Sequence, residues 1–131
     1  MRIFRNKSFT RFAKKADLDD AALRKAVDDV ERGLIDAKLG GGVIKQRVAR
    51  AGKGKSGGFR TIILHKAGVL AIFVHGFAKN DQGNIQANEL AALKLLASQI
   101  LSYDDRAISR AVESGTLIEV ARDEKKDKTV S

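Results

Sequence analysis

Cationic side chains crowd one short stretch of the chain. Seven lysines and arginines fall within residues 45–66, KQRVARAGKGKSGGFRTIILHK, and no aspartate or glutamate does. Clustered cations without carboxylates of their own can bind phosphate groups, whereas a solubility surface usually mixes both signs. We therefore interpret the stretch as a phosphate-binding patch, with a solvated surface around a glycine hinge as the simpler alternative. The cations around the glycine-rich turn are Arg47, Arg50, Lys53, Lys55 and Arg60.

The same asymmetry extends over a wider segment. The chain has 131 residues and a formal net charge of +9. Residues 37–80 hold nine lysines and arginines and no acid, while residues 1–36 and 81–131 contribute +2 and −2. The middle segment therefore carries the whole net charge, a pattern that is most often the footprint of nucleic-acid binding.

A second set of candidate residues follows in VHGFAKN, at the end of an apolar strand. Alternate residues of a strand face the same side, and antiparallel pairing with the preceding strand would bring Arg60 next to Lys79 and within reach of His75. A lone histidine on an apolar face is more often a core residue than a catalyst. His65, nearer the turn, is the weaker candidate. One parity of the strand comprises Val69, Ala71, Phe73, His75, Phe77 and Lys79.

These residue types restrict the possible chemistry. A metal-dependent nuclease needs Asp or Glu to hold Mg²⁺, and none lies between Ala37 and Asn80. Metal-independent cleavage of RNA remains: the 2′-hydroxyl attacks the adjacent phosphate, a base removes its proton, cations stabilise the phosphoryl oxygens, and an acid protonates the leaving oxygen. A lysine crowded by cations has a lowered pKa and could act as base or acid, while arginine stays charged. We expect no metal and no cofactor.

Composition excludes several other classes of protein. With no cysteine, the chain can form no disulfide, zinc–thiolate site or thiol nucleophile. Its longest apolar run, VLAIFV, is too short to span a membrane, and the N-terminus lacks the apolar segment of a secretory signal. We expect a cytoplasmic protein without membrane contact.

The N-terminal elements follow from hydrophobic periodicity. A short strand is expected at about Arg2–Arg5, followed by a helix with Ser8 as its N-cap. A second amphipathic helix starts near Asp17 or Asp19 and stops at Gly33, where glycine can take the left-handed conformation of a helix end. These two helices are expected to form a hairpin.

From residue 43 the pattern becomes that of three strands, VIKQRVAR, FRTIILHK and VLAIFVHGFAK. The first two are joined by the flexible loop AGKGKSGG, and the last two by a tight turn at Ala67-Gly68. Two further helices are expected at about residues 86–102 and 104–115. The predicted fold class is α+β: an N-terminal helical hairpin packed on a small antiparallel sheet, followed by C-terminal helices. We expect one domain over residues 1–120 and a charged, disordered tail at 121–131.

The runs LGGGVIKQRVARAGKGKSGGFRTIILHK, FVHGFAKND and NELAALKLLA together resemble the RelE/ParE superfamily of bacterial toxin–antitoxin toxins, particularly its HigB-like branch. The resemblance covers roughly residues 1–120. It implies a sheet packed on a helical hairpin, and the activity of a ribosome-dependent, metal-independent mRNA endoribonuclease that inhibits translation. The implied partners are mRNA, the 70S ribosome and a cognate antitoxin, of a kind that can carry a helix-turn-helix DNA-binding domain.

The resemblance also implies roles for individual residues. Lys53 and Lys55 would bind the substrate phosphate or transfer protons, and Arg60 would stabilise the transition state. Lys79 would be a second cation or a general acid or base, and His75 completes the candidate catalytic set. The remaining candidates would contact RNA: Lys45, Arg47, Arg50, Phe77 and Asn80.

The family itself contains an alternative function. Several RelE-type toxins use a tyrosine near the C-terminus to stack on a base or assist the chemistry. The only tyrosine of this chain, Tyr103, ends the expected third helix and does not match that position, so Phe77 or His75 would have to substitute. The superfamily also includes ParE toxins, which inhibit DNA gyrase and cut no RNA. A non-nuclease toxin or a nucleic-acid-binding module is therefore the alternative.

Overall fold

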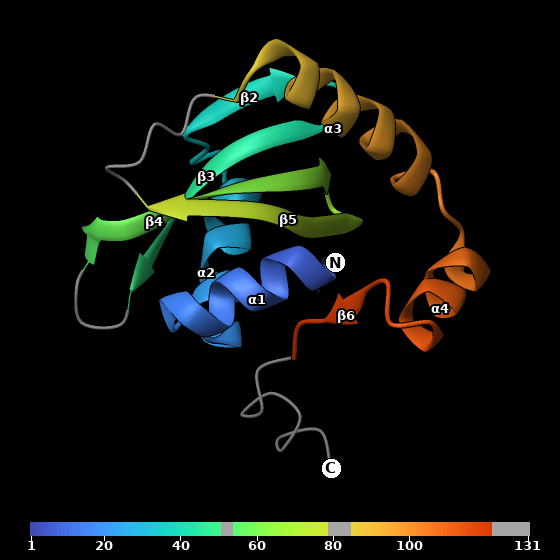
Figure 1. Ribbon diagram of the computed structural model, residues 1–131, viewed down its shortest axis with the longest axis horizontal. Helices are drawn as coiled ribbons and strands as arrows, with labels where there is room; N and C mark the ends of the chain where they lie inside the picture. Colours follow the sequence, from blue (N-terminus) through green and yellow to red (C-terminus); the bar gives the residue numbers. More distant parts are fainter. Residues whose placement is uncertain (51–53, 79–84, 122–131) are drawn as a thin grey trace.

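The computed structural model describes residues 1–50, 54–78 and 85–121, with side chains for all of these except Arg50 and residues 54–57. One six-stranded sheet lies at its centre, with helices on both faces (Figure 1). In chain order the elements are β1 (Arg2–Arg5), α1 (Lys7–Ala16), α2 (Asp20–Glu31), β2 (Ala37–Gly40), β3 (Val43–Arg50), β4 (Gly54–Lys66), β5 (Leu70–Ala78), α3 (Ala87–Ile100), α4 (Asp105–Glu113) and β6 (Ile118–Glu119).

Short polar residues set the starts of the first two helices. The side-chain oxygen of Asn6 accepts a hydrogen bond from the backbone N–H of Phe9 at 2.8 Å, so Asn6, rather than the expected Ser8, caps α1. Ser8 lies inside the first turn because the extended backbone of the preceding strand already ends at Asn6. Asp19 caps α2, and Gly33 follows α2 with a φ of +86°.

The three central strands pair as the sequence predicts. β3, β4 and β5 form an antiparallel meander, and Gly68 turns between the last two with a φ of +71°. β4 begins at Gly54, so part of the expected flexible loop continues the strand.

Three outer strands extend this meander. β1 pairs in parallel with β5, β6 pairs antiparallel with β1, and β2 pairs antiparallel with β3, giving the order β2-β3-β4-β5-β1-β6. The α+β class is confirmed, and the sheet is larger than the predicted three-stranded meander. β2 was not predicted because its four residues, AKLG, contain no β-branched or aromatic side chain.

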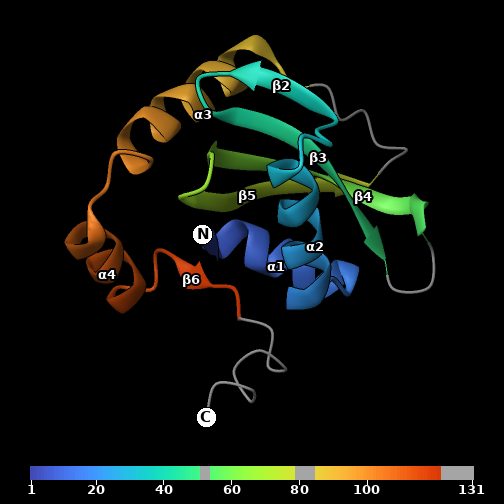
Figure 2. The ribbon, with the colours of Figure 1, turned by 180° about the vertical axis from the view of Figure 1, so that it is seen from behind.

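Two hydrophobic cores lie on opposite faces of the sheet. Figures 1 and 2 show α1 and α2 together on one face, while α3 runs over the other. The core beneath α1 and α2 includes Phe9, Leu23, Val27, Ile63 and Phe73. The core beneath α3 and α4 includes Val43, Ile62, Leu64, Ile72, Ala97, Ile100 and Ile108.

The far C-terminus is only partly described. Of the expected tail at 121–131, residues 122–131 lie outside the described part of the chain, so the predicted domain boundary stays a prediction. Among the helices that the structure describes, none combines the length and apolarity needed to cross a membrane.

Candidate nucleic-acid interface

A β-bulge at Val74 determines on which face of the sheet the last side chains of β5 lie. Ile63 pairs with Phe73 and Ile62 pairs with His75, so Val74 is an extra residue without a partner in the ladder. An extra residue reverses the alternation of side chains beyond it. His75 is thereby turned to the face of Ile62, away from that of Phe73.

The bulge corrects the predicted parity of this strand. Phe73 packs on Phe9 of α1, with ring centroids 5.0 Å apart. Gly76 also faces α1, because a Cβ built there would meet the ring of Phe12. His75 and Phe77 flank Gly76 and therefore lie on the opposite face of the sheet. The expectation that they share the face of Ala71 and Phe73 is wrong.

This reversal brings five predicted residues together. Arg47 pairs with Arg60 and Arg60 with Phe77, while Lys45 pairs with Ile62 and Ile62 with His75. Directly opposed residues of neighbouring strands share a face. We call this surface of β3, β4 and β5 the cationic face. It consists of Lys45, Arg47, Arg60, His75 and Phe77.

The aromatic members of the cationic face differ in burial. His75 is exposed, and within the described part of the chain it makes no side-chain hydrogen bond. Phe77 is half-buried, packs against the core beneath α3 and contacts the His75 ring at a centroid distance of 5.8 Å. The interpretation of His75 as a satisfied core histidine is therefore wrong, and its imidazole is accessible to a ligand.

An acid does lie beside these cations, contrary to the sequence prediction. Asp36 is the last residue before the acid-free segment, residues 37–80, and it immediately precedes β2. Its carboxylate lies 2.9 Å from Nη1 of Arg60 and 3.4 Å from Nε of Arg47. A count along the chain places Asp36 with the N-terminal part, whereas the fold places its carboxylate at the cationic face.

The comparisons with known proteins agree with this architecture. Residues 1–120 match the family described as the RelE toxin of the RelE / RelB toxin-antitoxin system. The chain belongs to the RelE toxin family. A comparison with curated proteins gives no match.

Several predicted site residues of this RelE-family toxin cannot be placed. Lys53, Lys79 and Asn80 lie outside the described residues. Arg50 and Lys55 belong to β3 and β4, but their side chains are not described. The predicted approach of Lys79 to Arg60 therefore stays a prediction.

The described residues offer no metal-binding cluster. No group of three or more His, Cys, Asp or Glu side chains that could hold an ion occurs among them. Asp36 is the carboxylate that contacts the described arginines of the cationic face, and both of its oxygens face guanidinium groups.

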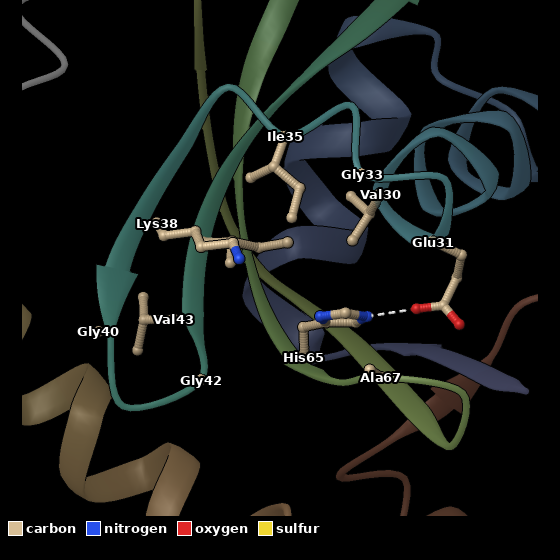
Figure 3. Close-up of a pocket in the computed structure, with 11 residues that line it drawn as sticks. Val30, Glu31, Gly33, Ile35, Lys38, Gly40, Gly42, Val43, His65 and Ala67 are labelled. Carbon is tan, nitrogen blue, oxygen red and sulfur yellow. Dashed lines mark hydrogen bonds and ion pairs between the residues drawn. The ribbon is translucent and has the colours of Figure 1, made fainter.

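A pocket of about 460 Å³ lies between the end of α2, the β2–β3 turn and the β4–β5 turn (Figure 3). Nε2 of His65 lies 2.6 Å from the carboxylate of Glu31, which also accepts a hydrogen bond from the N–H of Gly68 at 2.8 Å. The bond with His65 is the main cause that lowers the pKa of Glu31. His65 thus ties the β4–β5 turn to α2. The pocket is lined by Val30, Glu31, Gly33, Ile35, Lys38, Gly40, Gly42, Val43, Ile44, His65 and Ala67.

Proposed function

We propose that this RelE-family toxin is a ribosome-dependent, metal-independent mRNA endoribonuclease of the HigB-like branch, which inhibits translation. The cationic face is the observation that carries the proposal. Arg47 and Arg60 lie side by side on neighbouring strands, and an exposed imidazole and an aromatic ring lie beside them on β5. Guanidinium groups suit phosphate, and an accessible imidazole suits proton transfer near neutral pH.

The proposed reaction needs only the RNA and these side chains. The 2′-oxygen of the substrate attacks the adjacent phosphorus, the bond from phosphorus to the 5′-oxygen breaks, and a 2′,3′-cyclic phosphate and a 5′-hydroxyl result. A base takes the proton of the 2′-hydroxyl, and an acid gives one to the leaving oxygen. Arg60 stabilises the charge that develops on the phosphoryl oxygens. His75 is the described residue that could serve as base or acid.

The other candidates complete the proposed site. Phe77 offers a ring on which an mRNA base can stack, in place of the tyrosine that other members use. Lys53 and Lys55 would contact phosphate or transfer protons, and Lys79 would supply a second cation or a general acid or base. The proposed contacts to the RNA backbone and bases come from Lys45, Arg47, Arg50 and Asn80.

The proposed partners follow from the family. A toxin of this kind is neutralised by a cognate antitoxin, for which a helix-turn-helix DNA-binding domain is the expected second function. Because its substrate is mRNA on the 70S ribosome, the proposed place of action is the cytoplasm.

The test is cleavage of a defined mRNA in a reconstituted translation system, with and without ribosomes. The toxin stock is treated with EDTA and desalted, and it is compared with an untreated stock. We expect cuts on translated message alone, at equal rates for both stocks. Arg60→Ala should lower the rate of these cuts by about 10³-fold, the upper end of the range for loss of one preorganised donor. Arg2→Ala is the matched control, because Arg2 is also an ion-paired arginine of the sheet but pairs with Glu119 at the opposite edge.

Intact message under all conditions would contradict the nuclease proposal. Supercoiling by DNA gyrase, measured with the same protein stocks, would then test the non-nuclease alternative. Cleavage by Arg60→Ala at the wild-type rate would instead remove Arg60 from the proposed mechanism.

A further inference from the structure

We propose that Asp36 is a positioning residue, which holds the guanidinium group of Arg60 in the orientation that the phosphate requires. The inference rests on the proposed function and adds to it a residue that has no predicted role. Asp36 touches no substrate in this scheme, because it acts through Arg60.

The two contacts of Asp36 differ in strength. Oδ2 of Asp36 lies 2.9 Å from Nη1 of Arg60, and both side chains are less than one-fifth exposed. Oδ1 lies 3.4 Å from Nε of Arg47, whose side chain is half exposed. A short charge-assisted hydrogen bond between shielded groups is less screened by salt than an exposed one. Asp36 therefore fixes Arg60 and leaves Arg47 comparatively free.

The contact with Asp36 occupies only part of the hydrogen-bonding capacity of the Arg60 guanidinium group. A guanidinium group has about five N–H donors, and the bond to Asp36 uses one of them, at Nη1. Among the described residues, Arg60 makes no other side-chain hydrogen bond. Among these residues, the remaining N–H groups make no hydrogen bond that a phosphoryl oxygen would have to displace.

Asp36 is itself held by a buried amide. Gln46, only 2 % exposed, accepts a hydrogen bond from the backbone N–H of Asp36 at 3.0 Å and donates one to the carbonyl of Leu34 at 2.8 Å. The hydroxyl of Thr61 donates to the carbonyl of Gln46 at 3.0 Å. The backbone at Asp36 is therefore anchored to β3, which fixes the point from which its carboxylate reaches Arg60.

The strand register explains why such a carboxylate is needed. Arg47 and Arg60 are direct partners on β3 and β4. Like charges placed opposite each other on neighbouring strands repel and destabilise the pair. A carboxylate shared between them offsets the repulsion and keeps Arg60 in place.

The experiment uses the full chain in four forms: wild type, Asp36→Ala, Arg60→Ala and the double variant. Cleavage of translated mRNA is measured over a range of programmed-ribosome concentrations to separate kcat from KM. Because a misplacement of about 1 Å can cost about 10²-fold in rate, we expect Asp36→Ala to lower kcat by about 10²-fold. Its KM should stay the same or fall, since the variant is more positive. In the Arg60→Ala background, removal of Asp36 should lower kcat little further.

Two matched variants control for fold and charge. Glu119→Ala also removes one carboxylate from an arginine pair, at the opposite edge of the sheet, and should leave kcat unchanged. Asp36→Glu keeps the carboxylate and should recover part of the lost rate. An Asp36→Ala variant that cuts faster than wild type would overturn the proposal, because the carboxylate would then compete with phosphate for Arg60. Equal losses of kcat in Asp36→Ala and Glu119→Ala would overturn it too.

A second measurement does not depend on the proposed reaction. The Nε–Hε group of Arg60 can be followed by NMR relaxation in the free protein. We expect it to be ordered in the wild type and mobile in Asp36→Ala. An ordered group in both proteins would overturn the positioning role. If the wild type cuts no mRNA, the proposed function fails, while this measurement still decides whether Asp36 holds Arg60.

Discussion

At the scale of single residues, the two arginines of the cationic face are held differently. Arg60 is mostly shielded and bonded to Asp36, whereas Arg47 is half exposed and its ion pair is longer. An exposed, loosely paired cation can follow a flexible RNA backbone. A shielded cation in a fixed orientation is better suited to stabilising charge that forms during the reaction.

Arginine-to-lysine substitutions should separate these two roles. A lysine at position 60 is a single charged centre and cannot keep the bond to Asp36 and also contact a phosphate in two places. We expect Arg60→Lys to lower kcat for mRNA cleavage by about 10²-fold to 10³-fold, the range for loss of one preorganised donor. Arg47→Lys should change KM by only a few fold. Equal effects of the two substitutions on kcat would contradict this distinction.

The pair of Glu31 and His65 predicts a dependence of stability on pH. Because the folded structure lowers the pKa of Glu31 below its ordinary value of 4.5, the ionised carboxylate stabilises the fold above that pH. This contribution is lost as the pH falls through the lowered pKa. We expect Glu31→Gln to reduce the free energy of unfolding at neutral pH by less than about 1 kcal/mol, as for other partly exposed pairs.

The difference between Glu31→Gln and wild type should shrink as the pH falls below about 4.5. Denaturant unfolding at several pH values measures it. Glu113→Gln, which removes the charge of an exposed glutamate of α4, provides the control for the loss of one negative charge. A difference that grows on acidification would show that the carboxylate is not stabilised by the fold.

The sequence predicted the residues that share the cationic face better than it predicted their ion-pair partners. Lys45, Arg47, Arg60, His75 and Phe77 were all candidates, and they share one face of the sheet. Asp36 was missed because a count of charges along the chain cannot reveal which carboxylate a fold brings to a strand. Its neighbour Gln46, which is a polar residue at a buried position, gave no periodic signal in the sequence.

At the scale of elements, the bulge in β5 could not be located from the sequence. The run LAIFV is apolar at every position, so it reads the same whether or not one residue is inserted into the ladder. The sequence therefore predicts the limits of β5 to within one residue. It assigns the side chains of His75 and Phe77 to the wrong face of the sheet. The helices were easier to predict, because Asp19, Asp104 and Gly33 are strong end signals.

Gly76 is needed at this bend of β5 because Phe12 packs directly against it. A Cβ at Gly76 would lie 2.3 Å from Cε2 of Phe12, far inside van der Waals contact. We expect Gly76→Ala to lower the free energy of unfolding by about 1–3 kcal/mol, the usual cost of overpacking. Thermal or denaturant unfolding measures this loss.

A double variant supplies the control for Gly76. In a Phe12→Ala background the ring is absent, so the added methyl group of Gly76→Ala has room. The two substitutions should then be strongly non-additive. Additive losses would mean that Gly76 is required for a reason other than contact with Phe12.

At the scale of the whole molecule, the charge distribution would govern the proposed binding to RNA. The protein has a net charge of +9, and its acid-free segment includes β3, β4 and β5. Phosphate contacts release bound counterions, so affinity falls steeply as salt rises. This property could be predicted from composition, because net charge does not depend on knowing the fold.

The salt dependence of ribosome binding should show which lysines contact RNA phosphates. We expect the affinity of the toxin for programmed ribosomes to fall linearly in a plot of log K against log salt. Lys45→Ala should reduce the magnitude of the slope by about 1, the contribution of one phosphate contact. Lys15→Ala removes an exposed lysine of α1, on the other side of the sheet, and should leave the slope unchanged. Identical slopes for Lys45→Ala and wild type would remove Lys45 from the proposed interface.

The position of β1 has a consequence for how the chain folds as it is synthesised. β3, β4 and β5 are adjacent in sequence and can pair as soon as they emerge, whereas β1 must wait for Leu70–Phe73 of β5. β6 completes the other side of β1 only when residues 118–119 have been made. Contacts between distant parts of a chain form slowly. The nascent protein can therefore form the hairpins of its cationic face early, whereas β1 stays unpaired until β5 has been made and the sheet is complete only when β6 pairs with β1.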